Sequence, residues 1–504
     1  MSRKNGFDNG LYLKQQTAAI LDRVEMFGNK LYLEFGGKLL FDYHAARVLP
    51  GFNPNVKMEL LQNLKGQADI LLCIYAGDIE RKKVRADFGI TYDSDALKLI
   101  DDLKEWNIDI RAVVITRYDN QPAAMIFKNK LERRSIKVYI HRYTKGYPTD
   151  VDTIVSDEGY GSNDYIETKN QLVVVTGPGP GSGKLATCLS QLYHEHKMGV
   201  KAGYAKLETF PVWNLPLKHP VNLAYEAATA DIMDFNQVDP FHLEAHQKIA
   251  INYNRDIEIF PVLKNILEKI SGTEAAYKSP TEMGVNKVGF AIKDDDAVQE
   301  SAKQELIRRY FRYKCEFAMG LVNKETLQRV QLLMNELGVK TDDRKVVTMA
   351  RKSVTEVQQQ QGNEGILCGA AIELHDGAFI TGNNSPLMHA ASSLVINAIK
   401  HLAGIPKKIH LLPHNITKSI GDFKINILNT KSASLDLEEM LIALSISAMT
   451  NSASQLAIEN LKDLRDCEIH MTHIPTPGDE AGLRRLGINV TSDPNFSTKN
   501  LFIK

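Results

Sequence analysis

The stretch at residues 171–198, QLVVVTGPGPGSGKLATCLSQLYHEHKM, constrains the fold most, because its character changes twice within a few residues. Its first six residues are rich in β-branched side chains, which is typical of a buried strand. The glycines and prolines at 177–183 cannot continue that strand, and helical spacing of apolar residues begins near Leu185. The sequence therefore predicts a strand, a glycine-rich loop and a helix in succession.

The loop between this strand and helix has the composition of a phosphate-binding loop. We expect several of its backbone N–H groups to point into one concavity at the start of the helix, where the helix dipole favours an anion. Lys184 reaches the same anion, and we expect its side chain to face solvent when no ligand is bound. The alternative is a tight strand-to-helix turn with an exposed lysine. The candidate binding residues are Gly177, Gly179, Gly181, Ser182, Gly183, Lys184 and Thr187.

The match to the nucleotide-binding pattern G-x-x-x-x-G-K-[ST] is incomplete. The pattern requires glycine where Pro178 stands and a hydroxyl where Leu185 stands. Gly177 lies one residue before the first of these positions, and Thr187 lies two residues after the second. Because the missing hydroxyl normally binds magnesium, the sequence supports phosphate binding more strongly than metal-dependent chemistry.

The overall composition excludes several classes of partner. With 61 basic and 61 acidic side chains, no net field draws the chain to nucleic acid or to an anionic membrane. The sequence shows neither a signal peptide nor an apolar run of membrane-spanning length. Its five cysteines are far apart, which indicates buried thiols in a reducing compartment. We expect a cytoplasmic protein with a small nucleotide or phosphate ligand; a homo-oligomer is left open.

Helical and strand patterns alternate through the first part of the chain, which predicts an α/β fold with a mostly parallel sheet. Such sheets bind ligands at the carboxyl ends of their strands. The first informative segment, 30–43, has two strand-like runs around Gly36-Gly37 and predicts a β-hairpin. The expected helices are 58–64, 94–106 and 122–134, and the expected strands are 69–75, 110–116, 137–141 and 202–207.

The patterns divide the chain into three parts. Residues 1–215 form an α/β domain with the N-terminal hairpin and the glycine-rich loop, residues 216–340 a mainly helical section, and residues 341–504 a second, C-terminal α/β domain. Within the last part, His375-Asp376-Gly377 predicts the turn of a hairpin. The strands expected there are 370–374, 378–381, 408–412, 468–473 and 488–491.

A turn-rich segment at 277–290, YKSPTEMGVNKVGF, stands between two helical blocks. One interpretation is a loop that lines a cleft against the glycine-loop domain, since functional groups concentrate on loops held by rigid elements. The other is a helix-capping loop, because Ser279-Pro280-Thr281 suits the entry to a helix. The candidate cleft residues are Lys278, Ser279, Thr281, Glu282 and Asn286.

Residues 171–214 resemble the opening strand-loop-helix-strand unit of dethiobiotin synthetase and CTP synthetase. This resemblance implies ATP and Mg²⁺ as cofactors, with Lys184 and Lys206 near the phosphates as candidate catalytic residues. It also implies that Glu208 replaces the usual aspartate as a magnesium ligand. The segments EFGGK and SPTEMGVN, together with the glycine loop, resemble an uncharacterised bacterial family of proteins about this long, which implies no established activity.

Three functional hypotheses follow. The first is an ATP-dependent enzyme of the ligase or kinase kind, which Lys206 and Glu208 favour. The second is a non-catalytic nucleotide or phosphate sensor, which Leu185 in the hydroxyl position favours. The third is a structural relic of a phosphate-binding loop in a protein whose site lies elsewhere, such as the 278–287 segment.

Overall fold

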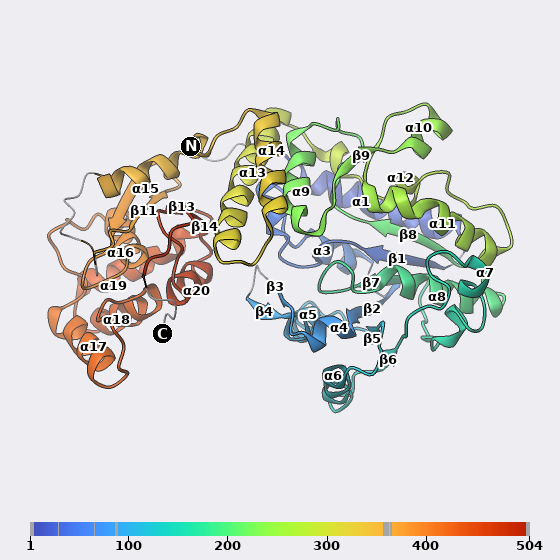
Figure 1. Cartoon of the computed structure of the whole chain (residues 1–504), viewed down its shortest axis with the longest axis horizontal. Coiled ribbons are helices and arrows are strands. Elements are labelled where there is room, and N and C mark those ends of the chain that lie inside the picture. Colours follow the sequence, from blue (N-terminus) through green and yellow to red (C-terminus); the bar gives the residue numbers. More distant parts are fainter. Residues whose placement is uncertain are drawn as a thin grey trace. The chain divides into compact units, whose positions relative to one another are not determined.

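The computed structural model describes residues 5–28, 30–64, 66–85, 89–355, 362 and 365–499. Its contacts separate two compact units (Figure 1). The N-terminal unit contains Lys4–Thr229 and Asp234–Ala302, and the C-terminal unit contains Ala230–Met233 and Lys303–Lys504. The division falls within one long helix, α13 (Asp295–Ala318). The three-part division expected from the sequence stays a prediction.

The N-terminal unit is built on a six-stranded sheet in the order β6-β5-β2-β7-β1-β8. All of its neighbouring strands pair in parallel, which confirms the predicted α/β class. The strands are β1 (Leu31–Phe35), β2 (Ala68–Tyr75), β5 (Ala112–Thr116), β6 (Val138–Ile140), β7 (Leu172–Thr176) and β8 (Gly203–Leu207). Two short pairs, β3 (Val84–Arg85) with β4 (Ile90–Thr91) and β9 (Asn236–Val238) with β10 (Ile251–Tyr253), lie outside it.

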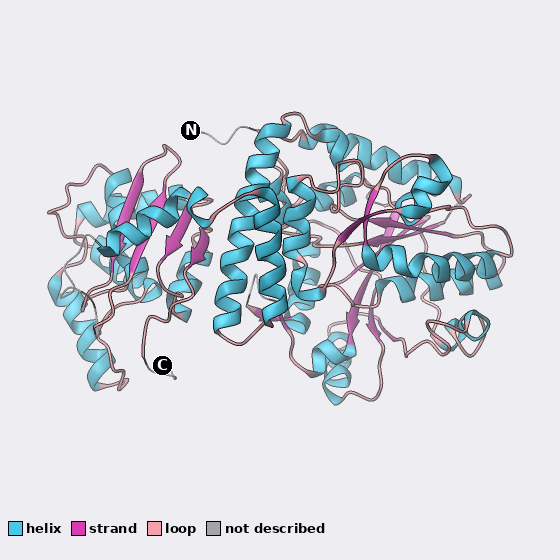
Figure 2. Ribbon diagram, turned by 45° about the horizontal axis from the view of Figure 1, so that its top comes forward, coloured by secondary structure: helices cyan, strands magenta, loops and turns pink. Residues whose placement is uncertain are grey.

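Both faces of this sheet are covered by helices, so its central strands are apolar on both sides (Figure 2). In β7, Leu172 and Val174 belong to one core and Val173 and Val175 to the other. The helices of the unit are α1 (Asn9–Met26), α2 (Tyr43–Val48), α3 (Val56–Asn63), α4 (Ala76–Glu80), α5 (Tyr92–Glu105), α6 (Pro122–Glu132), α7 (Val151–Ile154), α8 (Lys184–Lys197), α9 (Pro220–Ala228), α10 (Pro240–His246), α11 (Asn254–Ser271) and α12 (Pro280–Met283).

The predicted N-terminal hairpin is wrong. Only its first run forms a strand, β1, and that strand lies between β7 and β8, with Leu31 opposite both Leu172 and Gly203. All five residues of β1 are buried. The run therefore buries more apolar surface inside the sheet than it would in a two-stranded hairpin, and this burial stabilises the central position. Gly36 and Gly37 instead end the strand, and Gly37 has a φ of 67°.

The C-terminal unit has a four-stranded sheet in the order β12-β11-β13-β14. The predicted hairpin is confirmed, since β11 and β12 pair antiparallel, while β13 and β14 pair in parallel. The strands are β11 (Gly369–Glu373), β12 (Phe379–Asn383), β13 (Glu468–Met471) and β14 (Asn489–Ser492). Besides part of α13, the helices are α14 (Lys324–Leu337), α15 (Lys345–Thr355), α16 (Ala390–Leu402), α17 (His414–Asn426), α18 (Leu437–Ala448), α19 (Ser452–Glu459) and α20 (Pro477–Arg485).

The strand expected at 408–412 is not formed, and this segment is irregular. The ammonium of Lys400 donates hydrogen bonds to the backbone oxygens of Lys407 and Ile409, at 2.5 and 2.7 Å. A side chain therefore takes the acceptors that a neighbouring strand would otherwise need. In the part of the chain that the structure describes, no helix is both long and apolar enough to cross a membrane.

Candidate functional site

The glycine loop lies at the carboxyl end of β7, inside the parallel sheet, where α/β proteins bind their ligands. Its backbone conformation requires glycine at two positions. Gly181 has a φ of 72°, and Gly183, which precedes the first residue of α8, has a φ of 88°. A Cβ atom on Gly183 would also lie 2.6 Å from Thr116 Oγ1. The loop is therefore held close to the end of β5 as well as to β7.

Side chains of neighbouring residues hold the loop by donating to its carbonyl groups, and they do not engage its backbone N–H groups. Thr116 Oγ1 donates to the Ser182 carbonyl at 2.7 Å, and the Arg117 guanidinium donates to the Gly181 carbonyl. Among the described residues, no acceptor is found for the backbone N–H groups of Gly179, Gly181, Ser182 and Gly183. Donors of this kind at a helix N-terminus favour an anion.

Lys184 is buried, with 8% of its surface exposed, so the expectation of a solvent-facing side chain is wrong. Its ammonium lies 3.8 Å from Glu34 Oε1, and the other Glu34 oxygen accepts a hydrogen bond from the Tyr204 hydroxyl at 2.9 Å. Glu34 is in β1, next to β7 in the sheet. Lys184 is therefore buried because β1, which carries Glu34, lies between β7 and β8 in the sheet.

Two buried hydroxyl groups flank the loop, and neither has a hydrogen-bond partner among the described residues. They are Thr176 Oγ1, at the end of β7, and Ser182 Oγ. A buried hydroxyl without a partner costs about 1–3 kcal/mol. Ser182 Oγ is also close to the start of the loop, since a Cβ atom on Gly177 would lie 2.4 Å from it.

A cluster of charges around the buried Lys206 lies at the end of β8. Lys206 Nζ lies 2.8 Å from Asp256 Oδ2 and 3.2 Å from Glu208 Oε2, and it contacts the Tyr253 hydroxyl. Burial alone would lower the pKa of Lys206, but the charges of Asp256 and Glu208 outweigh it and hold that pKa well above its usual value. Burial raises the pKa of Glu208. Lys206 is therefore a permanent cation already paired with carboxylates.

Thr187 and the predicted metal ligand stay untested in their roles. Thr187 is on the buried side of α8, where its hydroxyl oxygen accepts a hydrogen bond from the Cys73 thiol at 3.4 Å. Glu208, the residue expected to hold magnesium, has the Lys206 ammonium beside it, in a position that a metal cation would have to share. Over the described ranges, no group of three or more His, Cys, Asp or Glu side chains has the geometry to hold a metal ion.

Sequence reasoning missed three residues that the fold brings to this edge of the sheet: Glu34, Lys57 and Asp256. Arg117 was expected there only as part of the loop 117–121, which follows a predicted strand. Lys57 donates to the backbone oxygens of Gly36 and Lys38 at 3.1 and 2.9 Å, and burial lowers its pKa. Arg117 stacks 3.6 Å from the ring centroid of Tyr75. The signal that could have indicated Glu34 is an acidic residue inside an apolar run.

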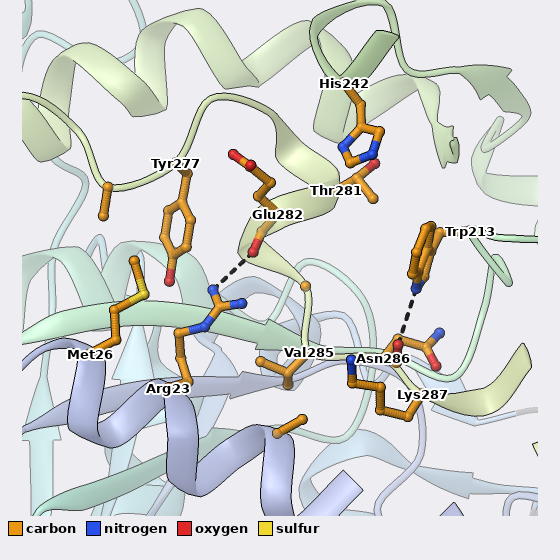
Figure 3. Close-up of a pocket in the computed structure, with 13 residues that line it drawn as sticks. Arg23, Met26, Trp213, His242, Tyr277, Thr281, Glu282, Val285, Asn286 and Lys287 are labelled. Atoms are coloured by element: carbon orange, nitrogen blue, oxygen red, sulfur yellow. Dashed lines mark hydrogen bonds between the residues drawn. The ribbon is translucent and has the colours of Figure 1, made fainter. Parts of the chain in front are cut away.

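The 277–290 segment caps a helix and also lines a cavity of about 280 Å³ (Figure 3). Ser279 and Glu282 form a reciprocal capping box at the start of α12, as one of the two interpretations expected. Thr281, Glu282 and Asn286 line the cavity, and Lys278 and Ser279 do not. The segment is joined to the edge of the large sheet, because the Val285 N–H donates to the Lys206 carbonyl at 3.0 Å.

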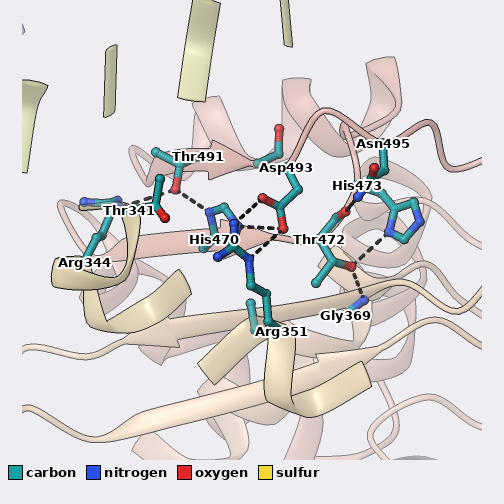
Figure 4. A network of polar contacts seen from close by, with 12 residues as sticks. Thr341, Arg344, Arg351, Gly369, His470, Thr472, His473, Thr491, Asp493 and Asn495 are labelled. Atoms are coloured by element: carbon teal, nitrogen blue, oxygen red, sulfur yellow. Dashed lines mark hydrogen bonds and ion pairs between the residues drawn. The ribbon is translucent and has the colours of Figure 1, made fainter. Parts of the chain in front are cut away.

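The C-terminal unit contains a separate polar network around β13 and β14 (Figure 4). Arg351 pairs with both oxygens of Asp493, at 2.7 and 3.1 Å, and the buried His470 shares a hydrogen bond with Thr491 Oγ1 at 2.9 Å. Burial alone would raise the pKa of Asp493, but His470 and Arg351 hold it well below its usual range. The network ties α15 to the sheet, and it includes no residue from the predicted site.

Comparison with known proteins places the whole chain in one family. Residues 5–338 match "Domain of unknown function DUF1846, N-terminal", and residues 342–502 match "Domain of unknown function DUF1846, C-terminal". The chain is 56% identical over 497 residues to a UPF0371 protein of Clostridium botulinum (strain ATCC 19397 / Type A), covering 99% of each. It is 55% identical over 499 residues to a UPF0371 protein of Clostridium tetani (strain Massachusetts / E88), again covering 99% of each. The chain therefore belongs to the uncharacterised family of proteins of about 500 residues that carries the DUF1846 domains.

Proposed function

We propose that the glycine loop binds the phosphate groups of a small ligand, a nucleotide such as ATP or another phosphate compound. The observation that carries the proposal is the set of backbone N–H groups at Gly179, Gly181, Ser182 and Gly183, directly before α8, for which the described part of the chain supplies no acceptor. Four donors within five residues, at the positive end of a helix, match the oxygens of a phosphate. Lys184 adds a charge at the same place, where charge-assisted hydrogen bonds are strongest.

Binding, rather than magnesium-dependent turnover, is what the side chains around the loop support best. The hydroxyl that would hold magnesium is replaced by Leu185, and the carboxylate of Glu208 is engaged by Lys206. We therefore propose a phosphate site whose affinity does not require Mg²⁺. A second candidate is an ATP-dependent ligase or kinase-like enzyme, favoured by the permanent cation Lys206 at the neighbouring strand end, which would stabilise charge on a moving phosphoryl group.

Calorimetric titration of ATP, GTP and inorganic phosphate, with and without Mg²⁺, tests both candidates. Lys184→Met should weaken binding by about 1.5–3 kcal/mol, the worth of a charged hydrogen bond. Lys197→Met is the matched control, because Lys197 is exposed at the opposite end of the same helix. Absence of binding by all three ligands would refute the proposal.

The magnesium arm separates the two candidates. Affinity that is equal with and without Mg²⁺, together with no nucleotide hydrolysis, agrees with a binding site or sensor. Magnesium-dependent turnover that Glu208→Gln abolishes would instead establish the enzyme.

A further inference from the structure

A second place in the N-terminal unit has the features of a ligand site. It is the cavity of about 280 Å³ between α1, α10 and α12, which has no part in the proposed phosphate site (Figure 3). Its volume is just below the range of about 300–1,000 Å³ that is usual for ligand pockets, so it suits a small ligand. Apolar surface from Met26, Val285 and the rings of Trp213 and Tyr277 forms part of its wall.

Two cations face this apolar surface. The Arg23 guanidinium is anchored by a hydrogen bond to the Glu282 carbonyl at 2.8 Å and lies 5.0 Å from the centroid of the Tyr277 ring. A guanidinium carries five N–H donors, so donors remain after this anchoring. The Lys287 ammonium lies 5.4 Å from the Phe290 ring centroid and has no carboxylate partner among the described residues.

His242 supplies a third donor. Ser279 Oγ accepts the Glu282 N–H at 3.2 Å and lies 3.0 Å from His242 Nδ1. No other acceptor for the Ser279 hydroxyl hydrogen is found among the described residues, so this hydrogen points to Nδ1 and the neutral ring carries its own proton on Nε2. Burial lowers the pKa of His242, which keeps the ring neutral near pH 7.

Two acceptors in the wall, the Glu282 carboxylate and the Asn286 carbonyl, are already engaged. The carboxylate of Glu282 pairs with His246 at 2.5 Å and accepts the N–H groups of Lys278 and Ser279, at 2.5 and 3.2 Å. The Asn286 carbonyl accepts from Trp213 Nε1 at 3.1 Å. A ligand in this cavity therefore meets the two cations Arg23 and Lys287, while the one carboxylate among the described lining residues, Glu282, is already held by His246 and by backbone N–H groups.

We propose that the cavity binds a small organic anion, in which a carboxylate or phosphate group is attached to an aromatic or other apolar body. The anionic group pairs with Arg23 and Lys287 and accepts from His242 Nε2. The apolar body packs against Trp213 and Met26, where the cavity offers ring and thioether surface.

The chain has a reporter for this cavity, because only two tryptophans are present, Trp106 and Trp213. In a Trp106→Phe protein, emission comes from Trp213 alone. We would titrate benzoate and phenyl phosphate, with benzyl alcohol as the neutral ring. We expect a saturable change in emission with at least one of the anions and none with benzyl alcohol.

Variants decide whether the binding occurs in the cavity. Arg23→Met and Lys287→Met, each made separately, should weaken anion binding at least about tenfold, as loss of a charged hydrogen bond does. Lys201→Met, which removes an exposed lysine that does not line the cavity, should leave it unchanged. Lys184→Met should also leave it unchanged, which separates this site from the glycine loop. No saturable change with either anion, an equal response to benzyl alcohol, or equal affinity in Lys287→Met and Lys201→Met would overturn the proposal.

Discussion

Neutralising Glu34 should tighten phosphate binding at the glycine loop. Lys184 Nζ lies 3.8 Å from Glu34 Oε1, and at an effective dielectric constant of about 20 their attraction is about 4 kcal/mol. Moving the ammonium from 3.8 Å to roughly 6 Å from Glu34, to meet a phosphate, therefore costs about 1.5 kcal/mol. Glu34→Gln removes that cost and keeps an acceptor for the Tyr204 hydroxyl. We expect an affinity for inorganic phosphate and ATP about tenfold higher than in the unchanged protein.

The assay is calorimetric titration of both proteins at low ionic strength, where the electrostatic difference is least screened. Glu195→Gln is a matched control. Glu195 is also buried, pairs with Lys30 at 2.6 Å and accepts from the Tyr32 hydroxyl at 2.7 Å, but it lies in the last turn of α8, at the end opposite the loop. Its replacement should leave phosphate affinity unchanged. Equal or weaker phosphate binding in Glu34→Gln would refute the reasoning.

Three further variants or reagents test the fold around these features. Gly177→Ala places a Cβ atom 2.5 Å from the Cys73 carbonyl and should lower the free energy of unfolding in urea by about 1–3 kcal/mol. Gly10→Ala is the control, because its Cβ atom would have its nearest contact at 3.6 Å and should not destabilise the protein. Equal urea midpoints for the two variants would contradict this expectation. Asp493→Asn should lower the free energy of unfolding by about 1.5–3 kcal/mol at pH 7. The pKa of Asp493 is depressed in the folded protein, so its contribution to the free energy of unfolding is present above the unfolded pKa of about 4 and is lost as pH falls through the folded pKa. If the stability difference between Asp493→Asn and the unchanged protein does not shrink in acid, Asp493 is not held by Arg351 and His470 as described. The five cysteines are buried, and burial raises the pKa of Cys73 to about 12, so thiol reagents should react only on unfolding; rapid labelling of the native protein would be inconsistent with this burial.

The sequence predicted the large sheet well where one local pattern decided the outcome. The strand at 171–176 and the helix after it were expected because β-branched residues, glycines and helical spacing follow one another, and β7 and α8 form within one residue of those bounds. The place of β1 depends on pairing with residues about 140 positions later, which no local pattern encodes. Its two glycines matched a hairpin turn, and the local interpretation was therefore wrong.

The same long-range pairing decided what could be foreseen of the candidate site. The loop and its lysine were found from composition, but the burial of Lys184 beside Glu34 depends on β1 lying next to β7. Likewise, Lys206 was placed near the loop by resemblance, whereas its partner Asp256 comes from the first turn of α11, about 50 residues later. Charges that meet across a sheet edge cannot be paired from one sequence alone.

The central claim, that the glycine loop receives a phosphate, is tested most directly by locating an anion in crystals. Crystals of the protein soaked with tungstate, a heavy analogue of phosphate, would be measured at the tungsten absorption edge. The account predicts an anomalous peak for the tungsten atom about 4–4.5 Å from the backbone nitrogens of Ser182 and Gly183, because a tungstate oxygen lies between them at hydrogen-bond distance, and loss of the peak in Lys184→Met crystals. Anomalous density found only elsewhere, or no density beside the loop nitrogens at saturating tungstate, would contradict the claim.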